Sequence, residues 1–532
     1  MASFTMSTVP QLSYRPTVPV VLRRARRLFA DNDYVVLPDR RISFHDVEAA
    51  SRRLAKQLLA VGVTKGTRVG IHLPTGPEWA VVFVAVTRIG ALAMPFSTLY
   101  RRDELRNALR IGDVSLLLSS PRILGKNHED FLEDAIPNLV RFPAGQLRIR
   151  EIPHLRSVWL IGETRRPWAT SAAVSPLEPD EIFDGFDDTM LKAVEDEVTP
   201  ADPMAAVFTS GTTADPKAVI HSQGAAIRKT SRIANAALNA QFGGRVLSLM
   251  PFFWVGGMQE MLAALQSGAA VVTLERLDPA TALELGRRER VTSVMGNPQA
   301  MRSMMGNTDL SQAIPTMATL PARPWEGGMN SRGDMSTPIG MTETFGPWSS
   351  IAGFECRIVD PDTMQSCADS EIGEFLVRGY ALAQSLYKQE REETFTDDGF
   401  YRTGDLGYTE NGHYYFASRL KDLIKTKGAN VAPAEVEAVL NSIDAVRMSF
   451  VVGLVHADYG EEVVAGVVPN DGQAIAVDEL LAVCRRRLSS YKVPQLIEVL
   501  SREEIPYLSS SKPDRRGIKS LLEVRRSHAR GR

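Results

Sequence analysis

Near the start of the chain, apolar residues follow first the spacing of a helix and then the continuous run of a buried strand. Residues 45–63 show the three-to-four-residue spacing of an amphipathic helix. The apolar positions at this spacing are Val47, Ala50, Leu54 and Leu58. Ser43 is a predicted N-cap, and Gly62 predicts the end of the helix. The short apolar run 68–74 follows and favours a buried strand.

The alternation continues along the chain. Residues 75–77, Thr-Gly-Pro, predict a second helix start, because proline is tolerated in the first turn of a helix. Residues 90–96 then predict another strand, and the same rhythm returns around 206–211 and 245–253. Strands that alternate with helices predict a large α/β domain, with helices covering both faces of a mostly parallel sheet.

The pattern changes after about residue 417. Two apolar runs of strand length, 446–455 and 461–469, are flanked by the amphipathic helical segments 432–443 and 477–488. This arrangement predicts a small α+β domain of about 110 residues. The polar stretch 418–422 separates two apolar segments and is the predicted boundary. The predicted domains are therefore residues 1–417 and residues 423–532.

Composition narrows the possible partners. The 532 residues are 44% hydrophobic and 23% charged, which is typical of a globular protein with large cores. The 61 Lys and Arg residues nearly balance the 63 Asp and Glu residues, so no net positive field attracts a polyanion. We therefore expect no nucleic-acid partner. The histidines and cysteines lack metal-ligand spacing, so a structural zinc site is not expected.

Targeting signals are also weak. The N-terminal residues lack a basic start followed by an apolar segment, so no secretory signal is expected. Residues 80–96 form the most apolar stretch, but Arg88 and Pro95 interrupt it, which favours a core helix running into a strand over a membrane span. Three widely spaced cysteines suit a reducing compartment, and we expect a cytoplasmic protein. Oligomeric state is left open, with a homodimer as one alternative.

The stretch FTSGTTADPKAVIH, residues 208–221, places hydroxyls, one glycine and one lysine between two apolar runs. Gly211 allows several backbone N–H groups to face one anion, and Lys217 adds a positive charge. The hydroxyl groups are those of Thr209, Ser210, Thr212 and Thr213. These features fit a polyphosphate cradle, although the spacing is not that of a Walker A loop. An ordinary surface turn has a similar composition, so the stretch alone leaves both interpretations open.

Further segments follow in a definite order. They are GMTET (340–344), YRTGDLG (401–407), SRLKDLIKTKGANVAPAEVE (418–437) and YKVPQLIEVLSREEIPYLSSSKPDR (491–515). Together with the threonine-rich stretch, they resemble the acyl-adenylate-forming superfamily, which contains acyl-CoA synthetases, coumarate ligases, luciferases and peptide adenylation domains. The resemblance spans nearly the whole chain. It implies that residues 418–422 act as a hinge and that the C-terminal domain is mobile.

The resemblance also implies roles for individual residues. The loop Thr209–Lys217 would close over the β- and γ-phosphates of ATP, and Thr342 would touch the α-phosphate. Glu343 would hold Mg²⁺, and the ribose would be bound by Asp405 and supported by Arg419. Gly340 and Met341 would line the nucleotide site. Lys421 would be the hinge, and Lys427 and Gly428 would line the passage for coenzyme A. The expected acyl pocket comprises Trp254, Val255, Gly256 and Gly257.

Lys512 matches the catalytic lysine of the superfamily. The carboxylate and the α-phosphate are both anionic, and one ammonium between them offsets their repulsion. The implied reaction joins a small-molecule carboxylic acid to AMP with release of pyrophosphate and then transfers the acyl group to coenzyme A. The apolar residues from Trp254 to Met258 favour a fatty or polycyclic acid.

Several positions depart from the superfamily pattern. Ala214 and Ala218 replace glycines of the loop, and Trp254 replaces a histidine at the mouth of the pocket. Ile339 replaces an aromatic residue, and Ser511 alters the motif before Lys512. These departures keep two alternatives open. The chain could pass its adenylate to a carrier protein, or it could bind nucleotide or acyl ligands without turnover.

Overall fold

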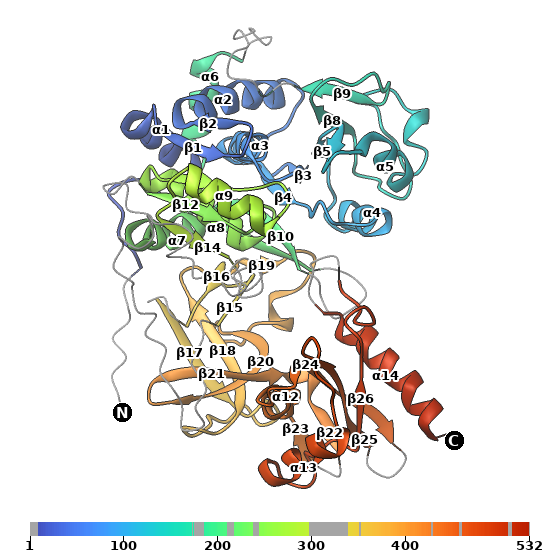
Figure 1. Cartoon of the computed structure of the whole chain (residues 1–532). Coiled ribbons are helices and arrows are strands. Elements are labelled where there is room, and N and C mark those ends of the chain that lie inside the picture. Colours follow the sequence, from blue (N-terminus) through green and yellow to red (C-terminus); the bar gives the residue numbers. More distant parts are fainter. Residues whose placement is uncertain are drawn as a thin grey trace. The chain divides into compact units, whose positions relative to one another are not determined.

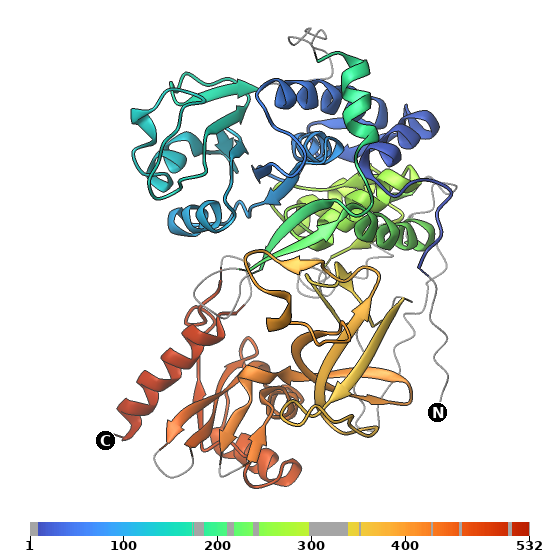
Figure 2. The same ribbon diagram turned by 180° about the vertical axis from the view of Figure 1, so that it is seen from behind.

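The computed structural model describes residues 9–172, 174, 186–209, 217–237, 244–296, 339–349, 353–426, 429–456, 460–508 and 513–530. The chain divides into two units (Figures 1 and 2). Unit 1 contains residues 1–325, 340–354 and 379–393. Unit 2 contains residues 326–339, 355–378 and 394–532. This division assigns part of the segment before residue 417 to the C-terminal unit, and the boundary at 418–422 stays a prediction.

The first predicted helix and strand are present. Helix α2 (Phe44–Ala60) begins after Ser43, whose side chain accepts a hydrogen bond from the backbone N–H of Asp46. Gly62 follows the helix with φ of +84°, a left-handed conformation that glycine adopts readily. Strand β3 (Arg68–His72) comes next, and helix α3 (Pro77–Arg88) begins at the proline. Local capping residues therefore set these boundaries.

The larger sheet of unit 1 has eight strands. Their order is β19 (Ser385–Leu386), β11 (Lys217–Ser222), β10 (Pro203–Thr209), β4 (Leu92–Pro95), β3, β5 (Leu116–Ser119), β8 (Ser157–Ile161) and β9 (Ala169–Ala172). The strands from β10 to β9 pair in parallel, as predicted. Strands β10 and β11 pair antiparallel, as do β11 and β19. The repeating pattern did not reveal this antiparallel edge, because the short chain segment after β10 returns as a hairpin instead of crossing over through a helix.

A second sheet of unit 1 has five strands. Their order is β14 (Ser293–Met295), β12 (Arg245–Ser248), β13 (Ala270–Val272), β1 (Asp33–Val36) and β2 (Arg41–Ser43). All neighbours pair in parallel except β1 and β2. Further helices and short strands of this unit include α1 (Val18–Phe29), α4 (Arg102–Ile111), β6 (Arg122–Ile123), β7 (Lys126–Asn127), α5 (His128–Ala135), α6 (Asp188–Asp196), α7 (Gln223–Ala237), α8 (Val255–Ser267) and α9 (Pro279–Arg288).

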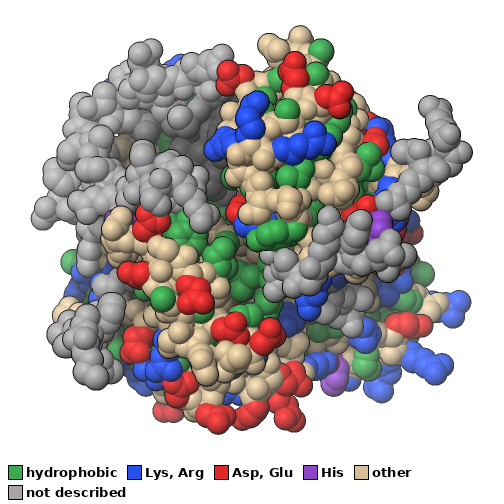
Figure 3. Space-filling view, turned by 90° about the horizontal axis from the view of Figure 1, so that it is seen from below, with side chains coloured by type: hydrophobic (Ala, Val, Ile, Leu, Met, Phe, Trp, Pro, Cys, Tyr) green, Lys and Arg blue, Asp and Glu red, His purple; other side chains and the backbone are tan. Residues whose placement is uncertain are grey.

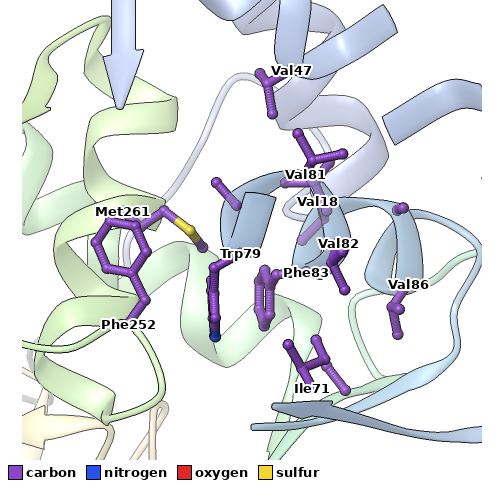
Figure 4. Packing of buried hydrophobic residues seen from close by; sticks show 14 of the residues in the cluster. Val18, Val47, Ile71, Trp79, Val81, Val82, Phe83, Val86, Phe252 and Met261 are labelled. Atoms are coloured by element: carbon purple, nitrogen blue, oxygen red, sulfur yellow. The ribbon is translucent and has the colours of Figure 1, made fainter. Parts of the chain in front are cut away.

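Helix α3 lies in the hydrophobic core of unit 1. Trp79 and Phe83 stack with their ring centroids 5.0 Å apart, and Phe252 meets the Trp79 ring edge at 5.6 Å (Figure 4). Met261 of α8 approaches the same indole. The prediction of a core helix that leads into strand β4 is confirmed. Among the described residues, no helix is long and apolar enough to cross a membrane.

A cavity of about 290 Å³ lies among charged side chains of α1, α2, α3 and α6. Arg88 is buried and donates from Nε to Glu195 at 2.6 Å and from Nη1 to Ser51 at 2.8 Å. At its edge, Lys56 pairs with Asp188 at 2.5 Å. Each of these cations has a carboxylate partner, which is what allows charges to be buried here.

Unit 2 contains two sheets. The first has the order β17 (Phe354–Val359), β18 (Gly373–Gly379), β20 (Tyr401–Glu410) and β21 (His413–Arg419). The second has the order β23 (Ala429–Val431), β22 (Ile424–Thr426), β25 (Gly460–Pro469) and β24 (Val446–His456), with β26 (Leu496–Val499) parallel to β25. The predicted strands 446–455 and 461–469 are therefore confirmed as one antiparallel pair.

The second sheet is buried on both faces, which explains its continuous apolar runs. Val451 and Val463 pack on one face with α12 (Pro433–Asn441) and α13 (Val477–Arg487). Val452 and Val464 pack on the other face with α14 (Arg515–Arg530). The α+β prediction for the C-terminal segment is confirmed.

On the face of the molecule shown in Figure 3, basic and acidic side chains are interspersed.

Candidate active site

The motif GMTET forms a tight β-hairpin in unit 1. Strands β15 (Gly340–Met341) and β16 (Gly346–Pro347) pair antiparallel, with residues 342–345 as the connecting turn. Phe345 and Gly346 both have positive φ, at +51° and +94°. A Cβ atom on Gly340 would lie 2.6 Å from the Cα of Pro347, so the close approach of the two strands requires glycine there.

The turn has an inner and an outer side. Thr344 and Phe345 are fully buried, whereas Thr342 and Glu343 are half-buried. The Thr344 hydroxyl donates to the carbonyl oxygen of Gly346 at 2.6 Å and accepts from the N–H of Met341 at 3.3 Å. The buried residues fix the turn and leave the two predicted functional side chains on its outer side.

The base of the predicted phosphate cradle is also in unit 1. Thr209 ends β10, Lys217 begins β11, and the two residues lie directly opposite each other. The Thr209 hydroxyl donates to the Lys217 carbonyl at 3.4 Å. Ala218 lies within the strand and is buried in an apolar cluster, so its methyl group has a packing role. Ser210, Gly211, Thr212 and Thr213 lie outside the described residues.

One short segment connects the cradle to the turn. The N–H of Ala383 donates to the Glu343 carbonyl at 2.7 Å, and the N–H of Gln384 donates to the Ile220 carbonyl at 3.0 Å. Ile220 belongs to β11, the strand that begins with Lys217. The structure therefore brings β11 and the Thr342–Glu343 turn to the two sides of a single peptide segment.

The predicted acyl-pocket residues form the start of α8. Trp254 is the half-buried N-cap, and its ring meets Phe253 edge-on at 5.5 Å. Val255 and Gly257 are buried in the first turn. A Cβ atom on Gly257 would lie 2.4 Å from the Pro251 carbonyl oxygen. This glycine has a backbone-packing function in addition to any contact with substrate.

The predicted ribose-binding residues lie together in unit 2. Asp405 of β20 and Arg419 of β21 are direct partners in the ladder, and Arg419 Nε lies 2.5 Å from Asp405 Oδ1. The Asp405 side chain is only 5% exposed, whereas that of Arg419 is 49% exposed. Gly404 has φ of +66°, which favours glycine immediately before the aspartate.

Lys421 lies just beyond this pair, in the 3₁₀ turn Leu420–Asp422. Partial burial and the nearby Arg419 guanidinium lower the pKa of Lys421. Lys427, Gly428 and Lys512 lie outside the described residues, so their predicted roles stay predictions. The matched residues are therefore grouped in two places, with one group in each unit.

Three buried titratable side chains of unit 1 did not emerge from the sequence motifs. Burial lowers the pKa of His221 to about 3 and that of Lys229 to about 7. Burial also raises the pKa of Glu260 to about 8, against a hydrogen bond from Ser248. Lys229 could have been noticed, because it falls on the same helix face as Ala225 and Ala226. A lysine on an apolar helix face indicates a buried polar contact.

Two family models match the chain. The model for AMP-binding enzymes matches residues 22–387. The chain belongs to the AMP-binding enzyme family. The model for the C-terminal domain of AMP-binding enzymes matches residues 435–512. The first match includes the Thr342–Glu343 turn and the cradle, and the second ends at Lys512. The resemblance inferred from the motifs is thus confirmed.

Relatives of this family member are named as CoA ligases. A methyl-dioxo-octahydroindenyl-propanoyl:CoA ligase from Mycobacterium tuberculosis is 30% identical, over 91% of this chain and 96% of the relative. The long-chain-fatty-acid–CoA ligase of Bacillus subtilis is 26% identical, over 94% of each chain. The family and these relatives identify the chain as an enzyme of the AMP-forming acid–thiol ligase class.

Solved structures show the same fold. The anthranilate CoA ligase AuaEII in complex with anthranoyl-AMP has a TM-score of 0.74 and 21% identity, covering 96% of this chain and 98% of that chain. The o-succinylbenzoate CoA synthetase MenE of Bacillus subtilis has a TM-score of 0.71 and 22% identity, covering 94% and 97%. The predicted fold class is confirmed by this likeness.

Proposed function

We propose that this enzyme activates a small-molecule carboxylic acid with ATP and transfers the acyl group to coenzyme A. A carboxylate oxygen attacks the α-phosphorus, and the bond to the β-phosphate oxygen breaks, so that acyl-AMP forms and pyrophosphate leaves. The thiolate of coenzyme A then attacks the acyl carbon and displaces AMP, while the thiol proton passes to solvent.

The observation that carries this proposal is the position of the Thr342–Glu343 turn beside β11. The hydroxyl of Thr342 would contact the α-phosphate, with Gly340 and Met341 lining the nucleotide site. The stretch Thr209–Lys217 would hold the β- and γ-phosphates with its hydroxyls, its backbone N–H groups and one ammonium. Because Ala383 and Gln384 bond to both elements, these contacts would serve one ATP molecule.

The donor set fits Mg²⁺ bound together with the nucleotide. Among the described residues, no group of three or more His, Cys, Asp and Glu side chains could hold a metal ion. Mg²⁺ commonly binds through one or two carboxylates plus substrate phosphates, and the half-buried Glu343 can supply one hard oxygen ligand. The ion would supply positive charge where the leaving pyrophosphate gains negative charge.

The residues of unit 2 would complete the reaction. Asp405 offers two carboxylate oxygens to the two ribose hydroxyls, and the Arg419 guanidinium forms an ion pair with that carboxylate. Lys512 would bridge the substrate carboxylate and the α-phosphate. Lys421 would act as the hinge between the two half-reactions, with Lys427 and Gly428 lining the coenzyme A passage.

The proposed substrate is an apolar fatty or polycyclic acid. Support comes from the apolar start of α8, from Trp254 to Met258. It also comes from the two relatives described above, one named for a long-chain fatty acid and the other for a fused-ring propanoyl group. A cytoplasmic location is part of this proposal. The proposal leaves the oligomeric state open, with a homodimer as one alternative.

Pyrophosphate release tests the proposal. Purified protein would be incubated with ATP, Mg²⁺ and a panel of acids that varies chain length and ring number, with and without coenzyme A. We expect pyrophosphate release with an apolar acid and thioester formation only when coenzyme A is added. Lys512→Ala should lose acyl-AMP formation and retain much of the ATP affinity, because its ammonium acts on the reacting atoms.

Three outcomes would redirect the proposal. Thioester formation on a phosphopantetheinyl protein in place of coenzyme A would establish a carrier-dependent acyl-AMP ligase. ATP binding by calorimetry without turnover of any acid would indicate a nucleotide-binding homologue. Full activity in Lys512→Ala would contradict the role assigned to this lysine.

A further inference from the structure

Lys229 of α7 is fully buried beside the turn that carries Thr342 and Glu343. Its Nζ atom lies 2.6 Å from the Thr344 carbonyl oxygen and 2.5 Å from that of Pro347. The ammonium also lies 4.6 Å from the centroid of the Phe354 ring. Lysine is rarely fully buried, and here it joins a carbonyl of the turn, that of Thr344, to a carbonyl of strand β16, that of Pro347.

Gln259 of α8 contacts the same turn from another helix. Its side-chain amide donates to the Phe345 carbonyl oxygen, and the side chain is 5% exposed. A Cβ atom on Gly346 would lie 2.3 Å from Gln259 Oε1, so the amide packs directly against the hairpin backbone. Two helices therefore supply donors to a single hairpin.

The remaining carbonyl groups of the turn are satisfied by nearby donors. Thr342 accepts from Phe345 N–H at 2.9 Å, and Glu343 accepts from Ala383 N–H at 2.7 Å. Gly346 accepts from the Thr344 hydroxyl at 2.6 Å. The carbonyls of residues 344, 345 and 347 instead receive donors from the Lys229 and Gln259 side chains. Buried carbonyls without donors would destabilise this turn strongly.

We propose that Lys229 and Gln259 are positioning residues that hold the backbone of the turn and thereby fix the direction of Thr342 and Glu343. The inference rests on the proposed function insofar as those two side chains contact nucleotide and Mg²⁺. Neither positioning residue needs to touch substrate. Their hydrogen bonds determine where the two adjacent outer residues stand.

Lysine suits this task over a wide pH range. Burial lowers its pKa to about 7, yet the neutral amine retains two N–H bonds, which is enough for the two carbonyl groups. A methionine has a similar length and flexibility but provides no donor. Lys229→Met therefore removes the hydrogen bonds with little change in side-chain volume.

The test compares three variants of the full-length protein. Lys229→Met and Gln259→Leu each remove donors to the turn. Lys56→Met is the matched control, because Lys56 is also buried in unit 1 but pairs with Asp188 in the charged cavity. Hydrogen exchange of residues 340–349 reports the turn directly. Steady-state pyrophosphate release, measured well below Tm, reports catalysis.

We expect faster exchange in residues 340–349 for Lys229→Met and, to a smaller extent, for Gln259→Leu. We also expect kcat for adenylation to fall about tenfold or more, since a shift of about 1 Å in a positioned group can cost about 100-fold. The KM for the acid should change less than kcat. Lys56→Met should reduce stability without altering exchange in the turn or kcat.

Wild-type exchange in the turn of a folded Lys229→Met protein would overturn the inference, and so would faster exchange with an unchanged kcat. If Lys229→Met does not fold, hydrogen exchange of residues 340–349 and kcat are measured for Gln259→Leu, and the same outcomes would overturn the inference. If the wild-type protein releases no pyrophosphate with any acid, the proposed function fails. In that case hydrogen exchange alone determines whether the two side chains hold the turn.

Discussion

The two units hold their candidate nucleotide-binding groups in different ways. In unit 1, the backbone that carries Thr342 and Glu343 is tied to the core by buried side chains from α7 and α8. In unit 2, Asp405 lies opposite Arg419 in the strand ladder, and the side chain of Arg419 is about half exposed. The first arrangement is a buried network, and the second is an ion pair with one partner in solvent.

This difference predicts different responses to mutation and pH. A buried hydrogen-bonded network loses stability when any donor is removed, because the orphaned carbonyl has no access to water. An ion pair with one solvated partner tolerates loss of the buried partner but not of the exposed one. In unit 1, we therefore expect loss of any buried donor to the turn to reduce stability. In unit 2, we expect a stability loss only when the exposed partner of the ion pair is removed.

Acid should weaken unit 1 first, and this is the largest expected effect. Burial lowers the pKa of His221 to about 3, and it lowers the pKa values of His72 and His128 in the same direction. Below pH 6.5 each of these histidines binds a proton in the unfolded chain that it does not bind in the folded chain, so its contribution to stability falls as pH decreases. Glu260, whose pKa is raised to about 8, acts in the opposite direction and offsets one histidine. The slope is about 1.4 kcal/mol per pH unit for each such histidine.

Tryptophan fluorescence during urea unfolding at pH 7 and pH 5 measures this effect, because all six tryptophans lie in unit 1. By pH 5, His221 alone should account for a loss of about 2 kcal/mol. In the described part of unit 2, no histidine is fully buried. A slope that is the same in His221→Gln as in wild type would contradict the prediction.

Glu343→Gln should separate function from stability within the turn. We expect pyrophosphate release to fall about 100-fold, because a charged oxygen ligand near the leaving group is lost. The neighbouring Thr344→Val should instead reduce the free energy of unfolding by about 1–3 kcal/mol, because a buried donor to the Gly346 carbonyl is removed. Kinetics and urea titration of both variants test this contrast. Equal stability losses would show that the outer side of the turn is as structural as its inner side.

The ion pair of unit 2 should respond asymmetrically, with the smallest effect on stability. Asp405→Asn leaves a solvated arginine and should mainly weaken ATP binding. Arg419→Gln leaves a buried carboxylate without this partner and should cost about 1 kcal/mol of stability. Calorimetric ATP titration and urea unfolding of both variants compare the two effects. If Asp405→Asn lost more stability than Arg419→Gln, the expected asymmetry between the buried and the exposed partner would be wrong.

Much of the local structure followed from short-range signals. The N-cap at Ser43, the proline that starts α3 and the glycine after α2 act within a few residues, so the sequence determined these boundaries. The continuous apolar runs 446–455 and 461–469 also predicted the two strands β24 and β25, which pair antiparallel in the structure. The motif order identified the family, since five spaced motifs rarely occur together by chance.

Other features depended on partners distant in sequence. The antiparallel pairing of β10 with β11 and the four-stranded sheet from β17 to β21 had no periodic signal. Lys229 and Thr344 lie 115 positions apart, and nothing near either residue indicates their contact. The same holds for the segment containing Ala383, which connects the turn to β11.

By itself, the sequence determined several helices and strands, the family and the residue types at the candidate site, because caps, periodicity and motifs act over short stretches of chain. Only the tertiary structure decided which buried side chains hold the Thr342–Glu343 turn and which carboxylate of unit 2 is shielded from water. The physical reason is that burial and hydrogen-bond satisfaction depend on what packs against a residue, and those neighbours come from distant parts of the chain.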